Sequence, residues 1–194
     1  AQALYYDASG TETTKSSSQK NSKDDSGVVP VASFFIETET NAGIVGLDVV
    51  PYGAKIADFD NARTDTDTDD GADTAGNNKG DINFKNHLTL YFEKPIAAAD
   101  GAFVKLGLHR VTIETDEEVA TGSTYGDENI MGIMVGFGKR TDLANGSFVK
   151  VEGQISRYEG ATFEGSLDSD SVRNSIELDD FNTAAIKISV GREF

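Results

Sequence analysis

Apolar and polar residues alternate along eight segments of this chain, and no stretch shows the three-to-four-residue repeat of an amphipathic helix. A two-residue period is typical of a β-strand with one apolar face and one polar face. Strands are therefore predicted over residues 2–8, 31–39, 43–52, 82–93, 102–114, 130–140, 148–158 and 183–194. The chain has 194 residues, enough for one all-β domain with a core.

Long and short connections alternate between these predicted strands. Three connections are short, at residues 40–42, 94–101 and 141–147. Four are long and polar, at about residues 9–30, 58–81, 115–129 and 159–182. Long loops on one rim and tight turns on the other are typical of an up-and-down β-barrel. We therefore expect residues 1–194 to form a single domain, an eight-stranded antiparallel up-and-down β-barrel.

The apolar face of such a barrel can point inward, as in a soluble protein, or outward into lipid. Three features favour lipid, and hence a transmembrane β-barrel. Glycines at 132, 136 and 138 suit a narrow interior. Two aromatic girdles are outlined, one near the short turns by Phe92, Phe137 and Phe194, and one near the long loops by Phe84 with Tyr52 and Tyr158. The four long loops carry 23 acidic and 6 basic residues, so the remaining chain is almost neutral.

Composition narrows the functional classes. The chain has 17 basic and 33 acidic residues, and a net charge of −16 argues against nucleic acid as a partner. There is no cysteine, which excludes disulfides and thiolate metal sites. No apolar run reaches the roughly 20 residues that a membrane helix needs.

The last segment ends on a phenylalanine, Phe194, with apolar residues at alternate positions before it, at Ile186, Ile188 and Val190. This ending resembles the C-terminal assembly signal of bacterial outer-membrane proteins, although Arg192 stands where that family usually has an aromatic or apolar residue. The alternation of loops and turns along the whole chain is similar to the small OmpA-, OmpX-, Opa- and OmpW-like barrels.

The resemblance implies a location in the bacterial outer membrane and a signal peptide that has been removed. It also implies contact with outer-membrane lipid and lipopolysaccharide, and recognition of the last strand by the barrel-assembly machinery. The expected function is structural, surface-display or porin-like, with acidic loops that present an interaction or cation-binding surface to neighbouring surface proteins or other copies. The alternative is a soluble secreted β-sandwich, such as an appendage or surface-layer subunit with calcium-ordered loops.

Charged residues and histidines share the predicted inward parity and form a candidate polar network in the lumen. They are Lys85, His87, Glu93, Lys105, His109, Lys150, Glu152 and Lys187, accompanied by Glu37, Asp48 and Glu193. One hypothesis is a conduit for small solutes. The other is a plug of ion pairs, because eight strands leave an interior just wide enough for side chains to fill.

An enzyme is not expected. Some small outer-membrane barrels modify lipids with a histidine, a serine and an acid, and that chemistry needs the nucleophile and the base within hydrogen-bond reach. His87 and His109 fall on adjacent predicted strands, whereas Ser156 and Ser189 fall elsewhere, and their spacing builds no triad.

Alternating carboxylates in the second long loop suggest calcium. Asp65, Asp67, Asp69 and Asp73 are the candidate ligands, because carboxylate oxygens at alternate positions can gather around Ca²⁺. The EF-hand pattern is incomplete, since glycine comes one position late and Gly76 stands where the glutamate is needed. A solvated acidic loop is the other hypothesis, and no other cofactor is expected.

In the fifth predicted strand the apolar parity changes between Leu108 and Val111, which predicts a bulge in residues 102–114.

Overall fold

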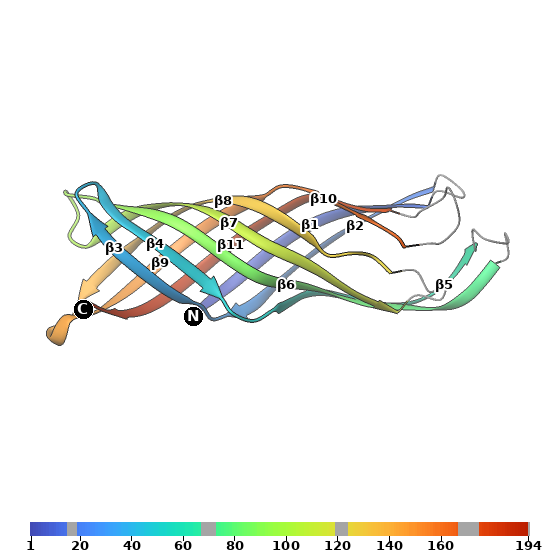
Figure 1. The fold of residues 1–194 in the computed structure, drawn as a ribbon, viewed down its shortest axis with the longest axis horizontal. Helices are drawn as coiled ribbons and strands as arrows, with labels where there is room; N and C mark the ends of the chain where they lie inside the picture. Colours follow the sequence, from blue (N-terminus) through green and yellow to red (C-terminus); the bar gives the residue numbers. More distant parts are fainter. Residues whose placement is uncertain (15–18, 67–72, 119–123, 167–174, 194) are drawn as a thin grey trace.

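The computed structural model describes residues 1–14, 19–66, 73–118, 124–166 and 175–193 (Figure 1). These residues form eleven strands and one short 3-10 turn, η1 (Ala144–Gly146). The strands are β1 (Gln2–Thr14), β2 (Gln19–Val31), β3 (Phe34–Thr40), β4 (Gly43–Val50), β5 (Ala54–Thr66), β6 (Asp73–Pro95), β7 (Ala102–Glu118), β8 (Glu128–Asp142), β9 (Ser147–Tyr158), β10 (Ala161–Glu164) and β11 (Ser175–Arg192). The described residues contain no helix long and apolar enough to cross a membrane. The predicted all-β class is confirmed.

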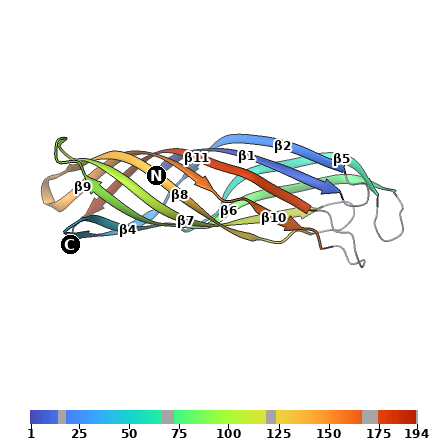
Figure 2. The ribbon, with the colours of Figure 1, turned by 90° about the horizontal axis from the view of Figure 1, so that it is seen from above.

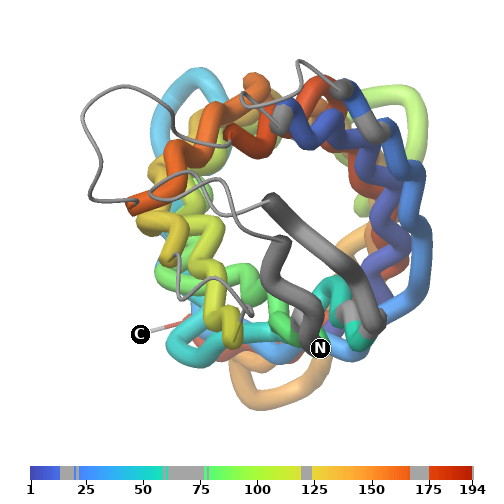
Figure 3. The backbone as a smooth tube through the Cα atoms, turned by 90° about the vertical axis from the view of Figure 1, so that its right-hand side faces the viewer, coloured from blue at the N-terminus to red at the C-terminus, as the bar shows by residue number. Residues whose placement is uncertain are grey.

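The strands form one antiparallel up-and-down sheet in the order β2-β1-β11-β9-β8-β7-β6-β4-β3. In addition, β5 pairs with β6 and β10 pairs with β11. This hydrogen-bonded order is open, and its two ends, β2 and β3, are consecutive in the chain. Figure 3 shows that the sheet nevertheless curls around an interior.

Three pairs of consecutive strands continue one another across short interruptions: β2 with β3, β4 with β5, and β9 with β10. The eleven strands therefore form eight runs, whereas eight single strands were predicted. The predicted short connections are also present, and at the last one Asn145 and Gly146 have φ angles of 80° and 74°. Asparagine and glycine suit this left-handed backbone better than other residues. Figures 1 and 2 place the short connections at one end of the molecule and β2, β5 and β10 toward the other.

The long loops are shorter than predicted, because much of residues 9–30, 58–81, 115–129 and 159–182 is strand. For example, β1 and β2 stay paired from Gln2 and Val31 to Thr14 and Gln19. These stretches are rich in Ser, Thr, Asn and Asp, which are typical of loops in a local reading of the sequence. Pairing with a neighbouring strand overrides that local preference.

A belt of apolar side chains covers the outer face of the sheet toward the short-turn end. Its members include Phe34, Ile36, Leu90, Val104, Leu106, Leu108, Met131, Ile133, Val135, Phe137, Val151, Ile155, Ile186, Ile188 and Val190, which are 44–72% exposed. Lysines and glutamates are buried on the inner face at the same level, and Lys150 and Glu93 are each 1% exposed. This polarity is that of a membrane barrel and the reverse of a water-soluble fold.

Beyond the belt the polarity reverses. Here the buried interior residues form an apolar cluster of Tyr6, Ile56, Phe84, Val111, Ile113, Ile130, Tyr158, Phe163 and Phe181. The outer face carries ion pairs instead, such as Lys55 with Asp81 at 2.7 Å and Lys79 with Asp60 at 3.7 Å. The hydrogen bond to Asp81 is the main reason that the pKa of the Lys55 ammonium is raised. We call this part the loop-side extension, and it contains residues 8–14, 19–27, 54–66, 73–84, 111–118, 161–164 and 175–181. The other cluster members, Tyr6, Ile130 and Tyr158, lie at its boundary with the belt.

A bulge in β6 marks the boundary between the two polarities. The pairing of β6 with β7 shifts between Lys85 and Leu88, and Asn86 has a φ angle of 53°. One extra residue reverses the parity of the strand. As a result Phe84, predicted for an outer aromatic girdle, is buried in the interior. Tyr158, predicted for the same girdle, is also buried, because in β9 it shares the inward parity of Ser156.

The bulge predicted in residues 102–114 is not present in β7. Inward positions follow one another without interruption at Lys105, His109, Val111 and Ile113, each less than 5% exposed. The apparent change of parity arose because the interior itself changes from polar to apolar along this strand.

Candidate functional site

Glycines on the inner face of β8 make room for the interior side chains. Gly132 pairs with His109 of β7 on one side and with Tyr158 of β9 on the other. A Cβ atom at Gly132 would lie 2.6 Å from Cδ1 of Tyr158, too close for any larger residue. Side chains of β7 and β9 can therefore meet across β8, which has no side chain between them at these positions.

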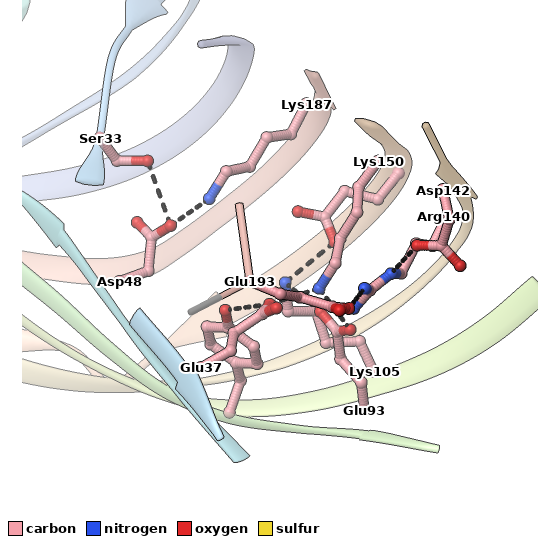
Figure 4. A network of polar contacts seen from close by, with 12 residues as sticks. Ser33, Glu37, Asp48, Glu93, Lys105, Arg140, Asp142, Lys150, Lys187 and Glu193 are labelled. Carbon is pink, nitrogen blue, oxygen red and sulfur yellow. Dashed lines mark hydrogen bonds and ion pairs between the residues drawn. The ribbon is translucent and has the colours of Figure 1, made fainter. Parts of the chain in front are cut away.

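An ion network fills the interior at the level of the apolar belt (Figure 4). Lys105 Nζ lies 2.9 Å from a Glu152 carboxylate oxygen and 3.1 Å from Glu93 Oε1. Lys150 Nζ lies 2.7 Å from Glu93 Oε2 and also pairs with Glu37. Glu93 thus bridges two lysines, and strands β3, β6, β7 and β9 are joined through their side chains.

A further ion pair and the ring of Tyr91 complete this network. Lys187 pairs with Asp48, which also accepts a hydrogen bond of 3.1 Å from Ser33 Oγ. The Tyr91 hydroxyl donates to Glu37 at 2.7 Å, and Lys105 Nζ lies 3.8 Å from the centre of the Tyr91 ring. We define the ion network as Glu37, Asp48, Glu93, Lys105, Lys150, Glu152 and Lys187.

The charges of the ion network nearly balance, with three lysines against four carboxylates. A buried charge without a partner is costly, whereas here each lysine has at least one carboxylate within ion-pair distance. At the short-turn rim Arg140 pairs with Asp142 at 2.7 Å and with Glu193. The interior is therefore held by fixed, mutually satisfied charges rather than by a row of free ones.

A histidine layer lies next to the ion network. His109 Nδ1 lies 2.8 Å from Thr89 Oγ1 and 3.1 Å from His87 Nε2, and its Nε2 lies 2.9 Å from Ser156 Oγ. The ring of Tyr158 stacks on His109 with centroids 5.3 Å apart and an interplanar angle of 17°. We define the histidine layer by these five residues.

The contact between His109 and Ser156 was not foreseen from the sequence, since it depends on the register across β8. A histidine beside a hydroxyl is the arrangement that activates a nucleophile. The cavity beside this pair, however, offers only about 20 Å³ to the centres of water molecules. That is space for one or two waters and leaves no room for a substrate.

The apolar cluster closes the interior on the far side of the histidine layer. The rings of Phe84 and Phe181 have centroids 5.1 Å apart, as have those of Tyr158 and Phe181. Phe181 is 1% exposed and Val111 is fully buried. The interior of the described chain thus contains three successive layers: ionic, histidine and apolar.

The structure brings most of the predicted lumen residues together. Glu93, Lys105, Lys150, Glu152 and Lys187 lie in the ion network, and both histidines lie in the histidine layer. Lys85 was placed in the lumen by its parity, and that placement is wrong. It follows the buried Phe84, is 40% exposed and pairs with Glu114, because the β6 bulge reverses the parity at this point.

The proposed assembly-signal residues Ile186, Ile188 and Val190 face outward and are 67%, 55% and 70% exposed. Phe194 lies outside the described residues.

Two of the candidate calcium ligands, Asp67 and Asp69, also lie outside the described residues. The backbones of Asp65 and Asp73 belong to β5 and β6, where Asp65 pairs with Thr74 and Asp73 with Thr66. Within the described ranges no group of three or more His, Asp or Glu side chains has the geometry of a metal site.

Comparisons with known proteins agree with this architecture. No protein-family model matches the chain, and no curated protein matches its sequence. The crystal structure of the outer membrane protein OprG from Pseudomonas aeruginosa is similar over 99% of this chain and 96% of its own, with 9% identity and a TM-score of 0.50. The chain has the fold of the bacterial outer-membrane β-barrels.

The β domain of the Bordetella autotransporter BrkA is also similar, over 96% of this chain and 98% of its own, with 12% identity and a TM-score of 0.31. That likeness is too distant to carry an argument. The outer-membrane β-barrel fold and the apolar belt agree with the location predicted from the sequence, the bacterial outer membrane.

Proposed function

We propose that this outer-membrane β-barrel protein is a sealed anchor that displays the loop-side extension, and that its eight runs of strand close into one barrel. The observation that carries the proposal is the double reversal of polarity. The belt region is apolar outside and ionic inside, whereas the extension is polar outside and apolar inside. A bilayer around the belt and water around the extension satisfy both regions.

Closure of the barrel is supported by the arrangement of the end strands. The open ends of the hydrogen-bonded order, β2 and β3, are joined in the chain by Ala32 and Ser33, and β2 lies against β5 in the extension. An unpaired strand edge within a membrane costs several kcal/mol for each unsatisfied backbone group, so closure is strongly favoured there.

The sealed interior favours display over transport. A route for small solutes would have to pass the ion network, the histidine layer and the apolar cluster, and the cavity between them is only large enough for water. We therefore assign the lumen residues to a plug and propose no catalytic role for His109 and Ser156. The acidic loops would then present a surface to cations, to lipopolysaccharide or to neighbouring surface proteins.

Migration on a detergent gel with and without boiling tests the anchor. The folded barrel should run at a different position from the boiled chain and should require detergent or lipid to remain in solution. A chain that stays monodisperse in buffer without detergent would instead favour the soluble β-sandwich. Deletion of Phe194 should slow assembly by the barrel-assembly machinery, and unchanged assembly would remove that residue from the signal.

A further inference from the structure

A groove crosses the outer face of β1, β11, β9 and β8, at the loop-side edge of the apolar belt. It is an open depression of about 410 Å³ on the surface of the sheet. Tyr5, Ala184, Ile155 and Val135 lie side by side across the four strands, because Tyr5 pairs with Ala184, Ala184 with Ile155, and Ile155 with Val135. The small side chain of Ala184 forms the floor between larger neighbours.

The walls of the groove are apolar and exposed. Ile155 is 65% exposed, Ile133 62%, Val135 52% and Tyr5 43%. One row toward the short turns, Gly153, which has no side chain, pairs with Ile186. A hydrocarbon chain lying in this groove would contact apolar side chains on both sides along its length.

Three polar residues lie in the next row toward the loops, where the apolar belt ends. Asp7 pairs with Asn182, and Asn182 pairs with Arg157, so an anion, an amide and a cation follow one another across three strands. Two strand spacings separate the backbones of Asp7 and Arg157 by about 10 Å. The Arg157 side chain is 73% exposed and contacts Asp180 at 3.3 Å. Asp7 forms no ion pair or hydrogen bond with another described residue.

We propose that this groove binds one phospholipid whose headgroup carries both a phosphate and an ammonium group. One acyl chain lies over Ala184, Arg157 binds the phosphate, and Asp7 binds the ammonium. A purely anionic headgroup would leave Asp7 unpaired beside a second negative charge, whereas a zwitterionic headgroup matches both residues. The proposal deepens the proposed function and rests on it, because the groove faces lipid only if the belt spans the membrane.

Native mass spectrometry of the intact protein in detergent tests the site. Phosphatidylethanolamine, phosphatidylglycerol with the same acyl chains, and lipid A are titrated separately onto the wild type. We expect one phosphatidylethanolamine to be retained in preference to the other two lipids. Ala184→Phe fills the floor and should weaken that binding about tenfold, the effect of removing roughly two methylene groups from contact. Leu106→Phe, a matched change on the outer face of β7, should have no effect.

Two variants at exposed positions test the headgroup contacts separately, including the case in which Ala184→Phe fails to fold. Asp7→Asn should remove the preference for phosphatidylethanolamine over phosphatidylglycerol, and Arg157→Gln should weaken binding of both. Equal binding by the Ala184 and Leu106 variants, or preferential retention of phosphatidylglycerol or lipid A by the wild type, would overturn the site. Each sample is also run unboiled on a detergent gel. A protein that shows no gel shift refutes the proposed function, whereas a shifted barrel that retains no lipid refutes the groove alone.

Discussion

Replacement of Lys150 by methionine tests whether the ion network holds the interior together. Lys150 is 1% exposed and pairs with Glu93 at 2.7 Å and with Glu37. Methionine keeps much of the side-chain volume and removes the charge. Glu37 and Glu93 then remain buried with one cation fewer between them.

The expected loss in the free energy of unfolding depends on the partners that Glu37 and Glu93 keep. Breaking a buried ion pair by removing one member typically costs about 3–5 kcal/mol. Glu93 keeps Lys105 at 3.1 Å, and Glu37 keeps the hydrogen bond from Tyr91, so we expect a loss near 3 kcal/mol, roughly the lower end of that range. Glu37→Gln in the same chain removes the excess negative charge and still accepts from Tyr91. The double variant should therefore recover about 1–2 kcal/mol relative to additive losses.

Urea titration of the protein in lipid vesicles measures these differences. The chain has no tryptophan, so the folded fraction is read from unboiled gel migration. Lys23→Met, at an exposed position of β2, is the matched control and should change the free energy of unfolding by less than about 0.5 kcal/mol. The reasoning is refuted if Lys150→Met loses no more than this control, or if the losses from Lys150→Met and Glu37→Gln are additive.

Three further predictions follow from the layers and the belt. Phe181→Ala should lower the free energy of unfolding by about 3–5 kcal/mol in the same titration, because the ring is buried in the apolar cluster; Phe137→Ala, at a lipid-facing ring, should lose less, and equal losses would contradict the layering. Leu108→Arg should cost about 2–4 kcal/mol in vesicles, whereas a loss below about 0.5 kcal/mol would indicate that the belt faces water. Asp67→Asn with Asp69→Asn should weaken calcium binding in a calorimetric titration, and unchanged affinity would remove this loop from the site.

The alternation of apolar and polar residues predicted the strands best where each face of the strand has the same polarity along its whole length. In β8 the apolar side chains Met131, Ile133, Val135 and Phe137 all face outward, as expected, because the inner face opposite them consists mainly of glycines. The same reasoning failed at Phe84. The bulge next to Phe84 inserts one residue into β6, and the local sequence does not indicate such an insertion.

The loop-side extension could not be predicted because its inner face is supplied by many strands at once. Ile56, Phe163 and Phe181 are each flanked by small or polar residues, so each looks isolated in the chain. Only the pairing of β5, β10 and β11 with their neighbours brings such residues together. The alternation along single strands also could not predict the contacts between the lumen residues. Parity placed His109 on the inner face, but its hydrogen bond with Ser156 depends on the register of three strands.

The most direct test of the account is the electrical conductance of the wild-type protein in a planar lipid bilayer. Insertion is verified by vesicle flotation and by the gel shift, and a porin added to the same bilayer shows that current can be recorded. The account predicts no steady single-channel current, because the ion network, the histidine layer and the apolar cluster fill the interior. Long-lived openings of uniform conductance from the folded, inserted protein would contradict the sealed anchor.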